Sequence, residues 1–232
     1  ALEKSDYGEY VHRILQAFHG GIKSLPGPWK GSLTEAEVEP AIKLLTQISQ
    51  IVFQPAIDAN LAARGWLKRW LAFLPEYINW TIERNKTWQL HSVEQRMQRE
   101  IAPGIDVKGR VDRIDIAENQ QAIIDYKTGL TPNMDAVETG EAVQLPSYAL
   151  LSENTVSRVE YVQFDKNKIY NKVNLEGDAL QALVHAIKQR LLMLTDSIGQ
   201  GQPLPAWGDP GICRYCEYDV VCRRDSWQDN VE

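Results

Sequence analysis

Two neighbouring segments in the middle of the chain restrict the fold more than any other part of the sequence. Residues 109–115 read Gly-Arg-Val-Asp-Arg-Ile-Asp, and residues 123–129 read Ile-Ile-Asp-Tyr-Lys-Thr-Gly. Alternation of apolar with charged side chains, and β-branched residues, indicate strands, and the polar stretch 117–120 between them indicates a turn. The two segments are therefore predicted to form a β-hairpin.

Pairing of Ile116 with Gln121 would set Asp112 directly opposite Asp125. Cross-strand Cβ atoms lie about 4.5–5.5 Å apart, and like charges at that separation are destabilising. Lys127 shares the face of Asp125, because side chains two residues apart on a strand point the same way. One interpretation is an ordinary solvated face. Isoleucines on the same face indicate partial burial, however, and a buried carboxylate pair either shares a proton or holds a cation. Hard oxygen ligands favour Mg²⁺ or Mn²⁺.

Asp112, the twelve residues after it and Asp125-Tyr-Lys resemble the D…(D/E)-x-K signature of the PD-(D/E)xK nuclease superfamily. The longer strings GRVDRID and IIDYKTG resemble the nuclease domains of the RecB and AddB subunits of bacterial recombination helicase-nucleases. The resemblance implies an α/β, restriction-endonuclease-like fold: a mixed β-sheet core flanked by helices, with an N-terminal helical portion and a C-terminal cysteine tail. It also implies a metal-dependent deoxyribonuclease, an exonuclease of recombination and DNA repair.

The resemblance assigns roles to individual residues. It implies that His12, Asp112, Asp125 and the backbone carbonyl of Tyr126 hold the Mg²⁺ or Mn²⁺ ion. Lys127 would orient the attacking water or stabilise the transition state. The histidine ends the string Gly-Glu-Tyr-Val-His, which is similar to the G-x-x-V/L-H helix of this family. Taken alone, a packed histidine bonded to the backbone would be the favoured interpretation.

Three further residues are candidate catalytic residues. Glu94 stands where the family carries an acidic residue before its first catalytic aspartate, and an exposed strand glutamate is an equally supported interpretation. Gln144 and Tyr148 resemble the Q-x-x-x-Y motif that follows D-x-K in this branch of the superfamily. Their spacing places both on one helix face, where they would position the strand or support the metal.

The chain's cysteines, Cys213, Cys216 and Cys222, form a C-x₂-C-x₅-C cluster near its end. This spacing indicates metal ligation rather than disulfides, and free packed cysteines are the alternative. Three thiolates leave a zinc ion or a cubane cluster one ligand short. In AddB-type domains an iron–sulfur cluster takes its fourth cysteine from upstream of the histidine helix. We therefore expect a 4Fe-4S cluster in the full-length protein that is incomplete or absent in this chain.

The pattern along the chain predicts helices over 5–20, 34–53, 56–86, 136–152 and 177–198, and strands over 88–101, 156–164 and 169–175. We expect a nuclease domain over residues 1–205, with a helical insertion over about 34–86 and a catalytic core over about 88–198. A cysteine-containing tail follows over residues 206–232. Aromatic residues recur through 56–86 and are interpreted as core, the alternative being a surface that stacks single-stranded bases.

Composition limits partners and location. No run of about eighteen apolar residues occurs, so no membrane span is expected. The charged start at residues 1–6 lacks the apolar core of a signal peptide. Together with the resemblance to bacterial nuclease subunits, this leads us to expect a bacterial cytoplasmic protein. The net charge of −6 means that any DNA contact must rest on local positive charge. We expect the partners to be DNA, single-stranded or at duplex ends, and a helicase domain or subunit, in a longer protein of which this chain is a segment.

Two other functions compete with the nuclease. The first is a catalytically inactive, nuclease-like module that binds DNA or a helicase partner and carries a structural cysteine tail. The second is a small zinc-binding interaction domain, which explains the cysteines and leaves the paired aspartates unexplained.

Overall fold

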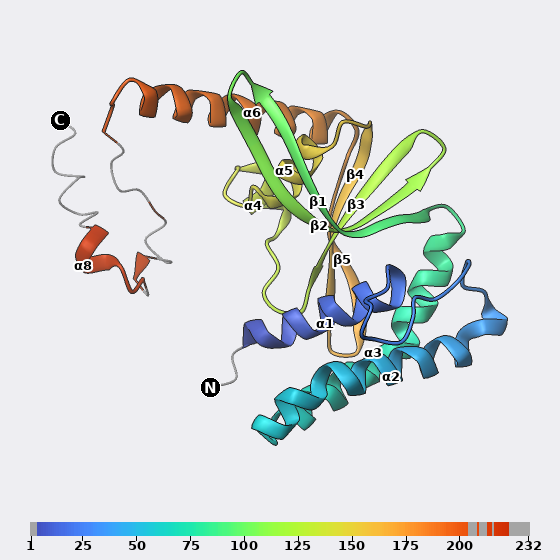
Figure 1. Ribbon diagram of the computed structural model, residues 1–232. Helices are drawn as coiled ribbons and strands as arrows, with labels where there is room; N and C mark the ends of the chain where they lie inside the picture. Colours follow the sequence, from blue (N-terminus) through green and yellow to red (C-terminus); the bar gives the residue numbers. More distant parts are fainter. Residues whose placement is uncertain (1–3, 204–207, 209–212, 215, 223–232) are drawn as a thin grey trace. The chain divides into compact units, whose positions relative to one another are not determined.

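The computed structural model describes residues 4–203, 208, 213, 214 and 216–222 (Figure 1). The chain divides into two compact units, residues 1–188 and 189–232. In chain order the elements are α1 (Lys4–His19), η1 (Glu35–Glu37), α2 (Val38–Ala59), α3 (Ala63–Asn85), β1 (Gln89–Ala102), β2 (Ile105–Ala117), β3 (Gln120–Lys127), α4 (Met134–Glu138), α5 (Gln144–Leu151), β4 (Val156–Asp165), β5 (Lys168–Glu176), α6 (Gly177–Gly199) and α8 (Asp219–Cys222). Within the described part of the chain, no helix has the length and apolar character needed to cross a bilayer.

The core of the first unit is a five-stranded sheet in the order β1-β2-β3-β4-β5. All neighbouring strands are antiparallel except β3 and β4, which run parallel and are joined through α4 and α5. A parallel pair needs such a crossover, because a tight turn can join only antiparallel strands. The predicted mixed sheet flanked by helices is confirmed, and so is the predicted hairpin register, with Ile116 opposite Gln121.

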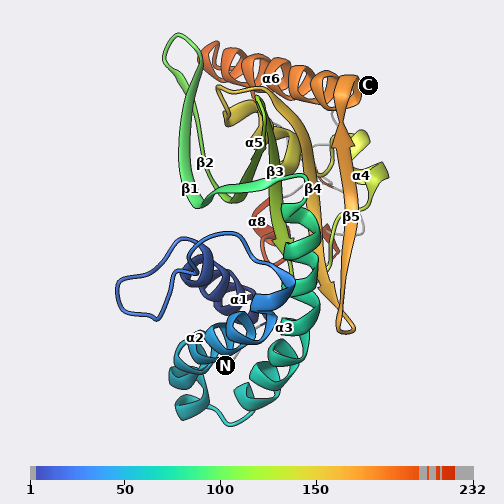
Figure 2. The same cartoon turned by 90° about the vertical axis from the view of Figure 1, so that its right-hand side faces the viewer.

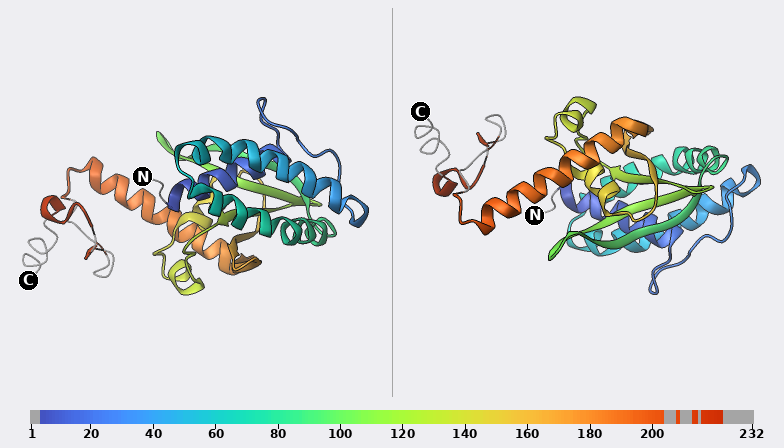
Figure 3. Two further views of the ribbon diagram at one scale, coloured as in Figure 1. Left: turned by 90° about the horizontal axis from the view of Figure 1, so that it is seen from below. Right: turned by 90° about the horizontal axis from the view of Figure 1, so that it is seen from above.

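Each face of the sheet is covered by a different helical layer (Figures 2 and 3). Alternate residues of β3 show the division: Ile124 and Tyr126 pack among α1, α2 and α3, whereas Ile123 packs with α5 and the first half of α6. The face of Ile123 is also that of Asp125, because side chains alternate along a strand. The layer that contains α5 therefore covers the carboxylate side of the hairpin.

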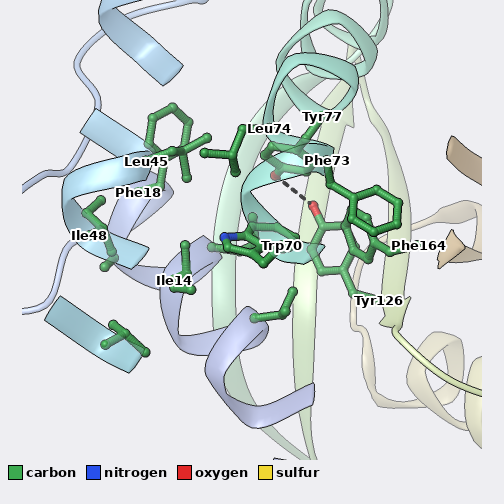
Figure 4. Packing of buried hydrophobic residues seen from close by; sticks show 14 of the residues in the cluster. Ile14, Phe18, Leu45, Ile48, Trp70, Phe73, Leu74, Tyr77, Tyr126 and Phe164 are labelled. Atoms are coloured by element: carbon green, nitrogen blue, oxygen red, sulfur yellow. Dashed lines mark hydrogen bonds between the residues drawn. The ribbon is translucent and has the colours of Figure 1, made fainter. Parts of the chain in front are cut away.

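The aromatic run of α3 forms core, as predicted. Trp70, Phe73 and Tyr77 are buried against Phe164 of β4 (Figure 4). The indole of Trp70 donates a hydrogen bond to the Ser49 hydroxyl at 2.9 Å, so its polar atom is satisfied inside the layer. A surface for stacking bases would need these rings exposed, and the stacking interpretation of these three rings is wrong.

Two helix boundaries differ from the sequence-based expectations. The single helix expected over 136–152 is two helices, α4 and α5, separated at Gly140, whose φ of +77° is incompatible with a continuing helix. The helix expected over 34–53 continues to Ala59, and a turn at 60–62 separates it from α3. On α6, Leu180 and Ile187 are buried, whereas Leu194 is exposed and lies in the second unit. The predicted boundary at residue 205 stays a prediction.

Candidate active site

Acidic side chains form a row across the first three strands of the sheet. Val93 pairs with Arg113 and Gln95 with Val111, so Glu94 lies opposite Asp112. The hairpin register extends from Arg113 and Ile124 by one position to bring Asp112 opposite Asp125. Each strand thus contributes one carboxylate to the same row. Because directly opposed like charges are destabilising, the row requires compensation by neighbouring groups.

The glutamate of this row has an unusual backbone. Glu94 has φ of +51°, in the left-handed region that non-glycine residues rarely occupy. Its side chain is only 6 % exposed, and its Oε2 lies 2.9 Å from Nε of Arg110. A non-glycine residue held in this region costs about 1–3 kcal/mol, and such residues concentrate at functional sites. The exposed-glutamate interpretation of the sequence is wrong.

Helix α1 brings a histidine to the end of the row. Gly8 permits the approach: a Cβ at that position would lie 3.2 Å from Oγ1 of Thr128, just beyond β3. One turn later, Nε2 of His12 lies 3.1 Å from the backbone carbonyl of Tyr126. Gly8 and His12 of the sequence motif therefore act together to place the imidazole at the site. The small residue allows close packing, and the imidazole reaches the end of the β3 strand.

The other imidazole nitrogen faces the acidic row. Nδ1 of His12 lies 3.4 Å from Glu94 and 3.4 Å from Asp112. Burial disfavours the charged imidazolium, but hydrogen bonds to Asp112 and Glu94, together with their charges, outweigh burial and raise the pKa of His12 to about 10. Ligand atoms of these three residues all lie within 4.8 Å of one another, close enough for one metal ion.

Asp125 lies beside this group and forms an ion pair with Lys127. Its carboxylate is 2.6 Å from Nζ of Lys127, whereas Asp112 accepts a hydrogen bond from the backbone N–H of Tyr126 at 2.8 Å. Burial and the charge of Asp112 raise the pKa of Asp125, Lys127 lowers it, and the result is about 6. The structure thus places His12, Glu94 and Asp112 in one group of ligand atoms, with Asp125 paired to the lysine next to it.

The first turns of α5 complete the surroundings of the lysine. Nζ of Lys127 donates a hydrogen bond to Oε1 of Gln144 at 2.8 Å, and the amide of Gln144 donates to the Tyr148 hydroxyl at 2.9 Å. Burial, followed by the charge of Asp125, raises the pKa of Tyr148 to about 12, so this hydroxyl is neutral. Gln144 and Tyr148 therefore contact the lysine side of the site and not the group around His12.

Tyr161 of β4 also belongs to this environment, although the sequence did not indicate it. It is the register partner of Asp125, so the row continues onto a fourth strand. Its buried ring lies below Nζ of Lys127, at 5.1 Å from the centroid, and its hydroxyl donates to Gln144 at 3.5 Å. The sequence signal was hidden because tyrosine on a buried strand is ordinary core composition. Only the β3–β4 register identifies it.

The site opens to solvent through a cleft of about 1300 Å³. Its walls include the acidic row of the sheet and His12 of α1. Further lining residues are Arg13, Arg110, Tyr126, Lys127, Gln144 and Tyr148. A cleft of this size admits a polymer backbone, and its carboxylates, histidine and cations are the residue types of phosphodiester hydrolysis.

The cysteines lie in the second unit. Cys213, Cys216 and Cys222 are all free thiols, and the last two are exposed. The backbone N–H of Cys216 donates to the carbonyl of Cys213 at 3.0 Å, a tight turn that brings the first two cysteines together. Such a turn is typical of C-x₂-C metal sites but is also an ordinary turn, so iron–sulfur ligation stays a prediction.

Comparison with known proteins identifies the family. The family model of the PD-(D/E)XK nuclease superfamily matches residues 1–223, nearly the whole chain. The chain belongs to this superfamily. Its mixed sheet is therefore that of a nuclease domain, as the sequence predicted, whereas the catalytic roles of the acidic row on β1, β2 and β3 stay a prediction. The match does not extend to the RecB or AddB type or to the function of the cysteine tail.

Individual relatives are more distant. Uncharacterised proteins of Rickettsia felis and Rickettsia typhi are 25% identical over 175 residues and 24% identical over 172 residues, which are 74% and 72% of this chain. The chain spans 19% of the length of each of these curated relatives. A solved structure from Eubacterium rectale named "Putative exonuclease" is 15% identical, covers 97% of this chain and 93% of its own, and has a TM-score of 0.45.

Proposed function

We propose that this domain hydrolyses phosphodiester bonds of DNA with Mg²⁺ or Mn²⁺ as the catalytic ion. The observation that carries the proposal is the meeting of His12, Glu94 and Asp112 in one cleft, with the Asp125–Lys127 pair beside them. Superfamily membership supports the reaction class, and the acidic row supports the metal.

The chemistry of the donors fits a hard divalent cation. Carboxylate oxygens of Asp112 and Asp125 and the carbonyl of Tyr126 are the ligands that Mg²⁺ and Mn²⁺ prefer, and His12 adds one nitrogen. Glu94 lies within reach of the same point. The raised pKa of Asp125 has the mutual repulsion of the carboxylates as one cause, and a cation would remove that repulsion. When bound, such an ion lowers the pKa of a water molecule and offsets charge on the scissile phosphate.

Lys127 would supply the remaining electrostatic stabilisation. Its ammonium group is held by Asp125, Gln144 and the ring face of Tyr161, so its position is fixed before substrate arrives. A fixed charge aimed at the place where negative charge develops lowers the barrier without reorganisation. Lys127 would therefore orient the attacking water or stabilise the transition state, while Gln144 and Tyr148 keep its side chain in place.

The narrower assignment, an exonuclease of RecB/AddB type in DNA recombination and repair, rests on the sequence resemblance. The helix motif ending in His12 and the string IIDYKTG support it. A helicase domain or subunit, a bacterial cytoplasmic location and a 4Fe-4S cluster held by Cys213, Cys216 and Cys222 belong to the same proposal. Because the chain spans about a fifth of its Rickettsia relatives, these assignments concern the whole protein.

A DNA degradation assay tests the proposal. Linear single-stranded, linear duplex and closed circular DNA are incubated with Mg²⁺ or Mn²⁺ and with chelator, using wild type, Asp125→Asn and the matched exposed control Asp165→Asn. We expect wild type and Asp165→Asn to degrade linear DNA only when metal is present, and Asp125→Asn to leave it intact. Degradation of linear but not closed circular DNA supports an exonuclease. Binding of DNA by wild type without any cleavage contradicts the proposal.

A further inference from the structure

The β1–β2 ribbon continues beyond the acidic row and carries basic residues there. Arg96 is the register partner of Arg110, and Gln98 is that of Lys108. Register partners point to the same face of an antiparallel pair, so Arg96, Arg110 and Lys108 share one face. All three side chains are exposed, and Arg110 also lines the cleft with Asp112. A basic face of the ribbon therefore begins next to the acidic row.

Two arginines in direct opposition are not explained by folding. Their Cβ atoms lie about 4.5–5.5 Å apart, a distance at which like charges destabilise a strand pair. Glu94 offsets Arg110 through a 2.9 Å contact. Within the described part of the chain, the side chains of Arg96 and Lys108 make no hydrogen bond, ion pair or ring contact. An anion from outside the chain would supply the missing compensation.

The basic face has defined limits. Towards the tip of the ribbon, Glu100 pairs with Asp106, but these acids are already engaged: Glu100 accepts from the N–H of Gly104, and Asp106 accepts from Gln98. The other face of the ribbon packs against α5, since a Cβ on Gly109 would lie 2.7 Å from Leu151. Val111 and Ile114 belong to the same buried cluster, so the regular alternation of β2 shifts between Val111 and Arg113 and both Gly109 and Ile114 can lie on the α5 side. On the face that points away from α5, only the part next to the acidic row, which carries Arg96, Arg110 and Lys108, therefore remains for a ligand.

Spacing matches this face to a polymer that passes through the cleft. Arg110 and Lys108 precede Asp112 by two and four residues, which is about 7 and 13 Å along a strand. Arg13 of α1 also lines the cleft. A string of anions that crosses the site and continues along the ribbon would meet cations beyond the carboxylates. A single small anion would not need cations so far from the metal.

We propose that the inner half of the β1–β2 ribbon, Arg96, Arg110 and Lys108, binds phosphates of the DNA strand whose scissile bond lies at the metal. This proposal rests on the proposed nuclease function and extends it to how the substrate is held. It also answers the objection raised by the net charge of −6, because the cations are concentrated where the strand must lie. Contacts of this kind fix the position of the strand and carry no sequence preference.

Salt dependence of binding tests the proposal. Each neutralised phosphate of single-stranded DNA contributes about 0.7 to the slope of log K against log salt. Binding of a labelled single-stranded oligonucleotide is measured by fluorescence anisotropy with Mg²⁺ in a Lys127→Met background, which keeps all carboxylates and is expected to cleave the strand about 10²–10³-fold more slowly. Arg96→Gln/Lys108→Gln is compared with Lys168→Gln/Lys172→Gln, which removes two exposed lysines from the other edge of the sheet.

We expect the ribbon variant to lower the slope by about 1.4 and to weaken binding of all sequences alike, since it removes two phosphate contacts. The β5 control keeps the slope of its background. Equal slopes for the ribbon variant and the control overturn the inference, as does a background protein that binds no DNA. Because no cleavage is measured, this result is independent of the degradation assay, which alone decides the proposed function.

Discussion

The two faces of the β2–β3 ladder both carry buried charges, but only one face balances them. On the back, Arg84 and Arg113 pair with Asp115 and Glu160: Arg113 is 2.7 Å from Asp115, and Arg84 contacts Asp115 and lies 2.7 Å from Glu160. Two cations meet two anions, and the guanidinium groups of Arg84 and Arg113 lie 5.4 and 5.5 Å from the centroid of the Trp80 ring.

On the front, Glu94, Asp112 and Asp125 meet Lys127 and the largely exposed Arg110, and His12 carries a charge only when protonated. Balanced charges serve the fold, because each buried group already has its partner. An excess of carboxylates in an open cleft requires a cation from solution to compensate their charge. This difference in charge balance distinguishes the structural cluster on the back of the sheet from the functional cluster on the front.

The largest effect is expected from the back face. Asp115→Ala leaves two buried guanidinium groups without their shared partner, and breaking a buried pair in this way costs about 3–5 kcal/mol. Urea denaturation of the metal-free protein measures the loss. Asp125→Asn is the matched front variant, and we expect it to keep or raise stability because it removes repulsion. Equal destabilisation by both variants would mean that the faces do not differ in the way described.

Lys127→Met is expected to lower the rate of DNA cleavage by about 10²–10³-fold, the usual cost of removing one preorganised stabilising group. Stability should also fall, since the buried carboxylate of Asp125 loses the cation that lies 2.6 Å away. The initial rate on linear DNA with Mn²⁺, beside a urea titration, measures both quantities. A rate within twofold of wild type would remove Lys127 from the mechanism.

The front face should make the metal-free protein less stable as pH rises. The pKa of His12 is raised from 6.5 to about 10 and that of Asp125 from 3.8 to about 6. A raised pKa gives stability that is present below the ordinary value and lost as pH rises through the raised one. The melting temperature, measured in chelator, should therefore fall as pH rises from 4 to 6, because of Asp125, and again from 6.5 to 10, because of His12. Asp125→Asn should lose the lower step, and an unchanged lower step would contradict the assignment.

The smallest effects concern the two aromatic rings. Tyr161→Leu removes the ring below Lys127, a cation–π contact of about 0.5–2 kcal/mol, so cleavage should fall about 2- to 30-fold. Tyr161→Phe keeps the ring and should cost less. Trp80→Leu on the back should lower the melting temperature with little change in cleavage rate per folded molecule. A loss of cleavage rate in Trp80→Leu as large as in Tyr161→Leu would show that the faces are coupled.

Much of the hairpin was predictable because its information is local. The register of Asp112 and Asp125 follows from two strand patterns and a short turn, and the Arg113–Asp115 pair follows from alternation. Contacts between distant segments were not predictable from residue pattern alone. His12 was indicated by a family motif rather than by spacing. Tyr161 and the basic face of the β1–β2 ribbon were identified only from strand register.

The central claim is that the unbalanced carboxylates bind a metal ion for DNA hydrolysis. The most direct measurement is the Mn²⁺ dependence of linear DNA degradation by wild type and by Asp112→Asn, whose carboxylate contacts both His12 and the backbone of Tyr126. We predict saturable activation of the wild type by Mn²⁺ and no degradation by the variant at any Mn²⁺ concentration. Equal degradation by both proteins, or degradation by the wild type in chelator, would contradict the claim.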